Sequence, residues 1–225
     1  FMIGACLSQG RAQTKSAVSY KNPVVDIAMP DPTVIKAADG YFYVYATEST
    51  RNVPIMKSKD LVEWTYCNTA FTNKTRPRFE PKAGIWAPDI NYINGKYVLY
   101  YAMSVWGGEQ TCGIGVATAD SPQGPFTDHG KMFRSNEIGV QNSIDPSFLQ
   151  YEGRNYLVWG SFRGIYVIEL TADGLSIMPG AKKKRIAGTA FEAVYIHKHG
   201  DYYYMFASIG SCCQRSEEHT SELQS

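Results

Sequence analysis

Four acidic side chains stand at similar places along this chain, each shortly before a glycine turn and an aromatic-rich strand. They are Asp31, Asp89, Asp145 and Glu192, and the turns that follow them are Asp39-Gly40, Asn94-Gly95, Glu152-Gly153 and His199-Gly200. A repeat that brings one carboxyl group per copy to the same structural place can gather several carboxyls around one axis. Gathered carboxyls can act as general acid and general base, which is the chemistry of glycosidic bond cleavage.

The repeat itself indicates the fold. Asp-Gly and Asn-Gly form tight hairpin turns because glycine accepts the positive φ that these turns need. The strands predicted after the four turns are Tyr41–Thr47, Lys96–Met103, Asn155–Phe162 and Asp201–Ser208. A period of about fifty residues with several short strands per copy is typical of a β-propeller. No strong helical periodicity is present, so we expect an all-β fold with about four blades.

Composition limits the functional classes. The chain has 225 residues, enough for one sizeable domain, and its net charge of +1 gives no support for a nucleic acid partner. Aromatic residues make up 13% of the chain, which suits strand packing and also sugar-stacking surfaces. The five cysteines contain no C-x-x-C pair, so a zinc site is not expected. No stretch is long and apolar enough to span a membrane.

The first residues resemble the end of an export signal. We assign residues 1–21 to a signal-peptide remnant and leader, which is either processed in one of two ways or not processed. Ile3-Gly4-Ala5-Cys6 resembles a lipobox, which would place a lipid anchor on Cys6. Gly10-Arg11-Ala12 could instead precede ordinary signal cleavage. Either way we expect an exported protein that is periplasmic, extracellular or an outer-surface lipoprotein.

The last residues break with the repeat. Residues 22–214 form the predicted propeller domain, whose fourth copy stops soon after its second strand. Residues 215–225 can be back-translated into a sequence that resembles a sequencing-library adapter, so we interpret them as non-native. The ring is therefore expected to be incomplete and truncated at its C-terminal end. Open edge strands favour aggregation, and we expect marginal stability or poor solubility.

The acidic residues have two interpretations. Proline follows Asp31 and Asp145 and precedes Asp89, which favours extended backbone there. Any one of them could be a turn residue at a strand start, where aspartate is common. Because all four occur at similar offsets from their turns, we expect the carboxyls to sit at similar heights near the axis.

Several motifs together resemble glycoside hydrolase family 43, and they span most of the chain. They are Pro30-Asp31-Pro32, Trp86-Ala87-Pro88-Asp89-Ile90, Asn142-Ser143-Ile144-Asp145-Pro146, Gly160-Ser161-Phe162, Phe191-Glu192-Ala193 and Ser211-Cys212-Cys213. The resemblance implies a five-bladed propeller, incomplete here, that cleaves α-L-arabinofuranosyl or β-D-xylosyl bonds. The Asn-Ser-Ile-Asp-Pro, Gly-Ser-Phe and Ser-Cys-Cys pieces are most similar to the endo-1,5-α-L-arabinanase branch.

The resemblance also implies roles for three carboxyls. Asp31 matches the general base that activates water, Glu192 matches the general acid, and Asp145 matches the residue that orients the acid and tunes its pKa. Such an acid must keep its proton near neutral pH, so burial or a nearby charge must raise its pKa, and we expect Asp145 to supply that charge. The family inverts configuration, which needs roughly 6.5–9.5 Å between the base and the acid.

Further residues match family positions near the substrate. Asn142 and Ser161 correspond to positions beside the sugar in the catalytic subsite, and Cys212 either lines the cleft or only packs. Trp86 is either a packing residue or part of the cleft, and Asp89 has either a structural or a sugar-contacting role. Trp106, on a predicted glycine-containing loop, is a weaker candidate for a sugar-stacking rim.

Two departures from the family pattern qualify these expectations. Val194 stands where the family commonly has proline, which could shift Glu192. Relatives often hold a channel ion, calcium or halide, through a histidine of the fifth blade. No such histidine is present here, so no metal-binding residue is assigned and no cofactor is expected to be required.

Two other activities remain as alternatives. Within the family, the chain could be a β-xylosidase or an exo-acting α-L-arabinofuranosidase. From another class, it could be a non-catalytic propeller that binds glycans. The expected partner in each enzymatic case is a polysaccharide or oligosaccharide, and the sequence leaves the oligomeric state open.

Overall fold

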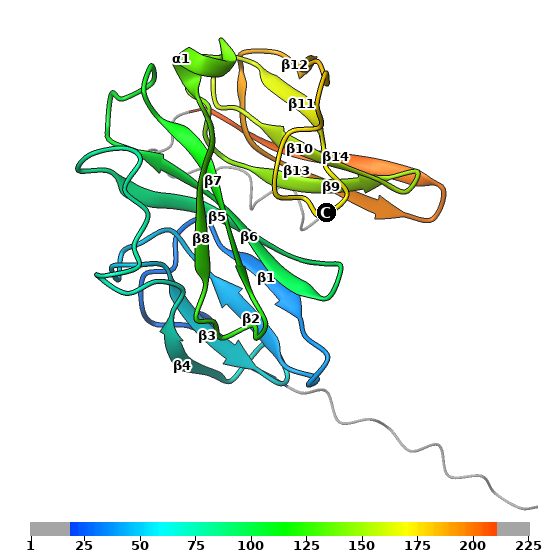
Figure 1. Cartoon of the computed structure of the whole chain (residues 1–225). Coiled ribbons are helices and arrows are strands. Elements are labelled where there is room, and N and C mark those ends of the chain that lie inside the picture. Colours follow the sequence, from blue (N-terminus) through cyan, green and yellow to red (C-terminus); the bar gives the residue numbers. More distant parts are fainter. Residues whose placement is uncertain (1–18, 211–225) are drawn as a thin grey trace, which may run out of the picture.

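The chain folds into antiparallel β-sheets arranged one after another along the sequence. The computed structural model describes residues 19–210. Three of its sheets have four strands, in the orders β1-β2-β3-β4, β5-β6-β7-β8 and β12-β11-β10-β9, and the fourth pairs β13 with β14. Figure 1 shows these sheets following one another in chain order, from blue to orange. The arrangement confirms an all-β propeller with four blades present, the fourth incomplete in the described part.

The strands of each sheet follow directly in sequence. The first sheet contains β1 to β4, at Thr33–Lys36, Phe42–Tyr45, Pro54–Ser58 and Trp64–Thr69. The second contains β5 to β8, at Gly84–Ile93, Lys96–Ser104, Gly113–Ala119 and Thr127–Arg134. The third contains β9 to β12, at Ser147–Tyr151, Arg154–Trp159, Ile165–Leu170 and Lys184–Ala187. The fourth contains β13 and β14, at Phe191–His199 and Tyr202–Ile209, and a one-turn helix, α1, covers Ser135–Ile138.

The four glycine turns predicted from sequence join the first two strands of each sheet. The strands after these turns are β2, β6, β10 and β14, which confirms the four predicted strands with small shifts at their ends. Figure 1 shows the four hairpin tips projecting toward the same side, to the right of the view. The first strand of each sheet therefore begins on the opposite side. Asp31, Asp145 and Glu192 lie at or near those beginnings, whereas Asp89 lies in the middle of β5.

Apolar side chains between neighbouring sheets hold the blades together. Between the first and second sheets, the rings of Tyr45 and Phe126 meet edge to face at 6.1 Å. Between the second and third, Tyr100 stacks on Phe148 at 6.0 Å. Val194 of β13 packs into a cluster with residues of the third sheet. Fully burying one large apolar side chain contributes about 1.5–3 kcal/mol, so these contacts fix the angle between blades.

The fourth sheet presents a large exposed apolar surface within the described residues. The side chains of Tyr202, Phe206 and Ile209 on β14 are 59–70% exposed. β14 has one hydrogen-bonded neighbour, β13, so its other edge is open in the described part of the chain. The described segments contain no helix that is long and apolar enough to cross a membrane. Several predicted features lie outside the described residues: most of the leader, the Cys6 anchor, Cys212 and residues 215–225.

Candidate active site

The first strands of the second and fourth sheets carry the same irregularity. In β5 the pairing shifts between Trp86 and Asp89, and in β13 it shifts between Glu192 and Tyr195. In each case two residues on the inner strand face one on its neighbour, which is a β-bulge. The segments before β1 and β9 repeat the pattern, because the main-chain oxygens of Pro30 and Ile144 accept the corresponding ladder hydrogen bonds.

The bulges place four residues in equivalent positions. The residue that opens each bulge is Asp31, Ala87, Asp145 or Ala193, with φ of 49°, 41°, 56° and 50°. Positive φ is uncommon for residues other than glycine, and such strained positions gather at functional sites. The next residue is proline in three blades and Val194 in the fourth. The bulge therefore gives the true alignment of the blades.

This alignment shows that the expectation of four matching carboxyls is wrong. Asp31 and Asp145 open their bulges, but Glu192 lies one residue before its bulge and Asp89 lies two residues after the opening position. Counting residues back from the turns missed this difference, because strand lengths differ between blades. Asp89 therefore does not lie with the other three carboxyls, which are found together at one end of the blades.

Asp31 is held by a hydroxyl at the end of the neighbouring strand. Thr47 Oγ1 lies 2.5 Å from Asp31 Oδ2, and the Ala87 main-chain N–H donates to the same Thr47 oxygen at 2.6 Å. Asp31 is exposed, and its other carboxylate oxygen has no hydrogen-bond partner within the described residues. The geometry gives Asp31 one fixed oxygen and one that is open to accept a proton from water.

Glu192 is held from the third sheet. Ser161 donates a hydrogen bond from Oγ to Glu192 Oε2 at 3.2 Å, and Asn142 Nδ2 donates to the Ser161 carbonyl at 3.0 Å. The turn before Ser161 needs glycine, because a Cβ on Gly160 would lie 2.2 Å from the Gly164 carbonyl oxygen. The Gly-Ser-Phe motif thus brings a buried serine to Glu192.

Asp145 connects the third and fourth sheets. Its Oδ2 accepts the main-chain N–H of Ala193, the residue after Glu192, at 3.2 Å. Burial, followed by the charges of Glu192 and Asp31, raises the pKa of Asp145 to about 7. The charges of Glu192 and Asp31 can shift the pKa of Asp145 only if both carboxyls lie within a few ångströms of it. Asp31, Asp145 and Glu192 therefore form one group, which we call the carboxyl cluster.

The pKa of Glu192 is also raised above its ordinary value. Burial is the main cause, the Ser161 hydrogen bond opposes it, and the charge of Asp31 adds to it. We expected the negative charge of Asp145 to raise the pKa of Glu192, whereas the structure assigns that effect to Asp31. Burial, and after it the charge of Glu192, raises the pKa of Asp145, so the two carboxyls share the tendency to keep a proton.

Asp89 occupies a different environment. It is 8% exposed, and its Oδ2 accepts hydrogen bonds from the Phe148 main-chain N–H and from Asn91 Nδ2, both at 2.7 Å. Burial raises the pKa of Asp89 to about 6, against hydrogen bonds from Phe148, Asn91 and Thr33. These contacts join the second sheet to the third, which favours the structural role over a sugar-contacting one.

Two tryptophans lie beside each other near the cluster. The rings of Trp86 and Trp106 have centroids 5.5 Å apart, and Trp106 is 80% exposed. Trp86 directly precedes Ala87, whose N–H contacts the Thr47 hydroxyl that holds Asp31. An exposed indole can stack on the apolar face of a sugar, so this pair is a candidate rim for the cleft.

The matching sequence model is that of Glycosyl hydrolases family 43, and it covers residues 20–225. The chain belongs to this family. An extracellular endo-α-(1→5)-L-arabinanase of Bacillus subtilis is 35% identical to it over 81% of this chain and 60% of its own length. A probable arabinan endo-1,5-α-L-arabinosidase A of Aspergillus niger is 31% identical, over 81% and 59%.

Solved structures of family 43 arabinanases have the same fold. A native Bacillus subtilis arabinanase matches with a TM-score of 0.72 at 32% identity, over 84% of this chain and 68% of its own. An α-L-arabinanase of Cellvibrio cellulosa matches with a TM-score of 0.74 at 28% identity, over 85% and 68%. This family 43 chain thus spans about three fifths of the length of the curated relatives that it matches.

Two groups in this family 43 chain were missed by sequence reasoning. Thr47 lies in no motif, and only its place opposite the first bulge reveals its role. Glu109 was also missed: it forms an ion pair with Arg163 at 2.9 Å and accepts a hydrogen bond from Gln141 at 2.7 Å. These contacts tie the loop of Trp106 to the third sheet. Among the described residues, no cluster of histidine, cysteine and carboxylate side chains could hold a metal ion.

Proposed function

We propose that the protein to which this chain belongs hydrolyses α-1,5-L-arabinofuranosyl bonds in arabinan, with inversion of configuration. The observation that carries the proposal is the carboxyl cluster, in which Ser161 holds Glu192 and Asp145 accepts the N–H of Ala193. Burial first, and then neighbouring charge that includes Asp31, raises the pKa of both Asp145 and Glu192. Carboxyls that share a site but hold protons unequally can divide acid and base roles. The relatives named as arabinanases indicate the substrate class.

Asp31 is the proposed general base. It is exposed, and one of its oxygens is fixed by Thr47 while the other is open within the described residues. Water placed on the open oxygen would lose its proton to Asp31 as it attacks the anomeric carbon. The Thr47 hydrogen bond fixes the carboxylate so that its open oxygen can take up that proton.

Glu192 is the proposed general acid. Its raised pKa favours retention of a proton, and Ser161 orients its carboxyl group through Oε2. The proton would pass to the departing glycosidic oxygen as the bond to the anomeric carbon breaks. Asp145 is the proposed orienting residue, because it accepts the N–H of Ala193 and so holds the backbone next to the acid.

The position at which the arabinan polymer is cut depends on the loops around the cleft. Both curated relatives are named endo-acting, which favours cleavage inside the polymer. Exo action is the second candidate, because a solved exo-1,5-α-L-arabinanase from a bovine ruminal library matches at 31% identity with a TM-score of 0.70. Export is proposed as well, since the Bacillus subtilis relative is named extracellular.

Product analysis on linear 1,5-arabinan tests the proposal. The full-length protein should release a range of arabino-oligosaccharides early in the reaction if it is endo-acting. One short product from the start would establish exo action instead. Absence of hydrolysis of linear arabinan by the folded protein would contradict the proposed function.

A further inference from the structure

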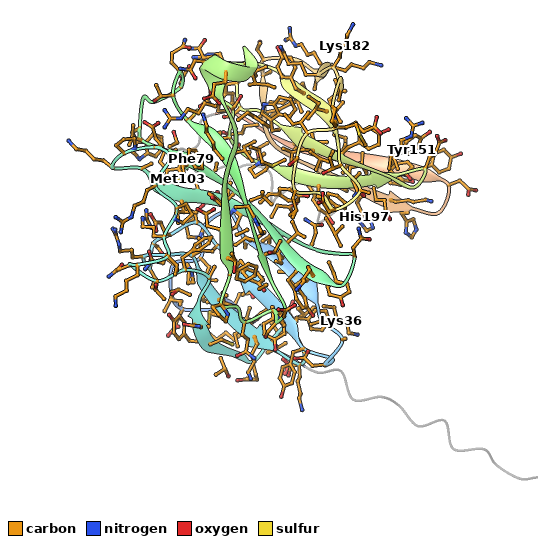
Figure 2. All side chains as sticks on the ribbon, viewed as in Figure 1. Lys36, Phe79, Met103, Tyr151, Lys182 and His197 are labelled. Carbon is orange, nitrogen blue, oxygen red and sulfur yellow. The ribbon has the colours of Figure 1, made fainter. Side chains whose placement is uncertain are left out.

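A basic hollow lies near the start of β5, on the same side of the blades as the carboxyl cluster. It has a volume of about 380 Å³, and its lining includes Arg51, Arg76, Arg78, Glu80, Lys82 and Met103. Most of these residues belong to the connection between β4 and β5. Figure 2 labels Met103 and, in that connection, Phe79; both lie on the side away from the hairpin tips of Figure 1. We call this hollow the basic pocket.

The charges in the basic pocket are not balanced. Arg76 forms an ion pair with the largely buried Glu48 at 2.5 Å. Glu80 lies 3.0 Å from Arg134, although the geometry there does not meet that of a hydrogen bond. The remaining cations, those of Arg51, Arg78 and Lys82, have no acidic partner within the described residues. An unpaired group of this kind attracts anions.

Two of these cations are held in place before any ligand arrives. Asn73 accepts a hydrogen bond from Arg51 Nε at its side-chain oxygen, at 3.1 Å, and one from Arg78 Nη2 at its main-chain oxygen, at 3.0 Å. Each guanidinium keeps further N–H groups free for a ligand. A guanidinium fork matches a carboxylate in shape and charge, which favours bidentate binding.

The basic pocket shares its framework with the carboxyl cluster. Glu48 pairs with Arg76 in the pocket wall and accepts the main-chain N–H of Ile85 at 2.9 Å. Glu48 follows Thr47, which holds Asp31, and Ile85 precedes Trp86. Thr47-Glu48 and Ile85-Trp86 therefore connect the wall of the basic pocket to the carboxyl cluster and to the tryptophan pair.

A chain of arabinofuranose carries no charge, so the cations of the basic pocket have no counterpart in it. We propose that the basic pocket binds the carboxylate of an acidic sugar, a uronic acid, joined to the glycan that is cut at the carboxyl cluster. This inference rests on the proposed function for its substrate class. Its ligand chemistry stands on the charges and the cavity alone.

Calorimetric titration tests the binding directly. The folded chain is titrated at low salt with trigalacturonic acid, with arabinotriose and with inorganic phosphate. Arg51→Gln/Arg78→Gln removes two pocket cations, and Lys82→Gln removes an exposed one that makes no hydrogen bond in the structure. Lys182→Gln/Lys183→Gln is the matched control, because it removes the same charge from exposed positions just before β12.

We expect trigalacturonic acid to bind more tightly than phosphate. The double arginine variant should weaken that binding about tenfold or more, as expected for lost charged hydrogen bonds, and Lys82→Gln should weaken it less. The lysine control and the binding of arabinotriose should be unchanged. No binding of trigalacturonic acid, equal weakening in the control, or phosphate binding as tightly would overturn the proposal.

The outcome is separable from that of the proposed function. Trigalacturonic acid binding without hydrolysis of linear arabinan would sink the proposed activity and leave the basic pocket standing. Hydrolysis of arabinan without trigalacturonic acid binding would do the reverse. Should the double variant fail to fold, the Lys82→Gln titration decides the result, since Lys82 is exposed.

Discussion

Thr47 donates its only hydroxyl proton to Asp31, and the neighbouring contacts fix that direction. The Thr47 oxygen accepts the N–H of Ala87 at 2.6 Å, so its proton points to Asp31 Oδ2, 2.5 Å away. Ala87 opens the bulge of the next blade, with φ of 41°. The strained backbone of one blade thereby orients the carboxylate of another, which gives the Trp-Ala-Pro-Asp motif a physical role.

Removing that hydroxyl should impair the base. Thr47→Val keeps the shape of the side chain and loses the donor, so kcat/KM on linear arabinan should fall about 10- to 100-fold, the value of a hydrogen bond to a charged group. Thr47→Ser restores the donor and should recover most of the rate. Equal rates for the valine and serine variants, at unchanged melting temperature, would remove Thr47 from the site.

The raised pKa of Asp145 predicts how stability changes with pH. Its folded-state value of about 7 lies above the ordinary 3.8, so the folded state holds this proton more tightly than the unfolded state. Stability therefore decreases as pH rises from about 4 to about 7, and the loss is complete above that window. Glu192 contributes in the same sense, because its pKa is also raised.

Asp145→Asn should remove this part of the pH dependence. The melting temperature of the variant, measured relative to the unaltered chain, should rise between pH 4.5 and pH 8. Asp120→Asn provides the control, since Asp120 is exposed and pairs with Lys96 away from the cluster. If Asp145→Asn and the control follow the same pH dependence, the carboxyl cluster is not coupled as described.

Asp89 should matter for stability more than for the chemical step. Asp89→Ala leaves the partly buried N–H of Phe148 and the Asn91 amide without their acceptor, at a cost of up to about 3 kcal/mol for each unsatisfied donor. Both donors use Oδ2, so Asp89→Asn can keep them on its remaining oxygen and should unfold near the native midpoint. Urea unfolding of the two variants gives the comparison. Equal destabilisation of both would show that the hydrogen bonds of Asp89 do not hold the second and third sheets together.

The repeat could be predicted from sequence because its signals are local. Asn-Gly and Asp-Gly turns followed by alternating aromatic residues predicted the second strand of each sheet, and β6 matches closely the prediction of Lys96–Met103. The three members of the carboxyl cluster were also predicted. Their assembly follows from the propeller, which brings the starts of all innermost strands to one end.

The register of the carboxyls could not be predicted by counting from the turns. The bulge shifts each strand start, and its sequence mark is the dipeptide at the opening position, as in Ala87-Pro88 and Asp145-Pro146. Aligning those dipeptides would have separated Asp89 from the others. Thr47 gave no such signal, because one hydroxyl at the end of a strand becomes important only through a partner on another blade.

The central claim is that Glu192 delivers the proton to the leaving group while Asp31 activates water. The most direct test is Glu192→Gln, assayed on linear arabinan and on an aryl arabino-oligosaccharide whose phenolate leaves without protonation. We predict a loss of roughly 10²–10⁴-fold on arabinan and a much smaller loss on the aryl substrate, whereas Asp31→Asn should impair both. Equal losses on the two substrates for Glu192→Gln, or near-normal turnover of arabinan, would contradict the account.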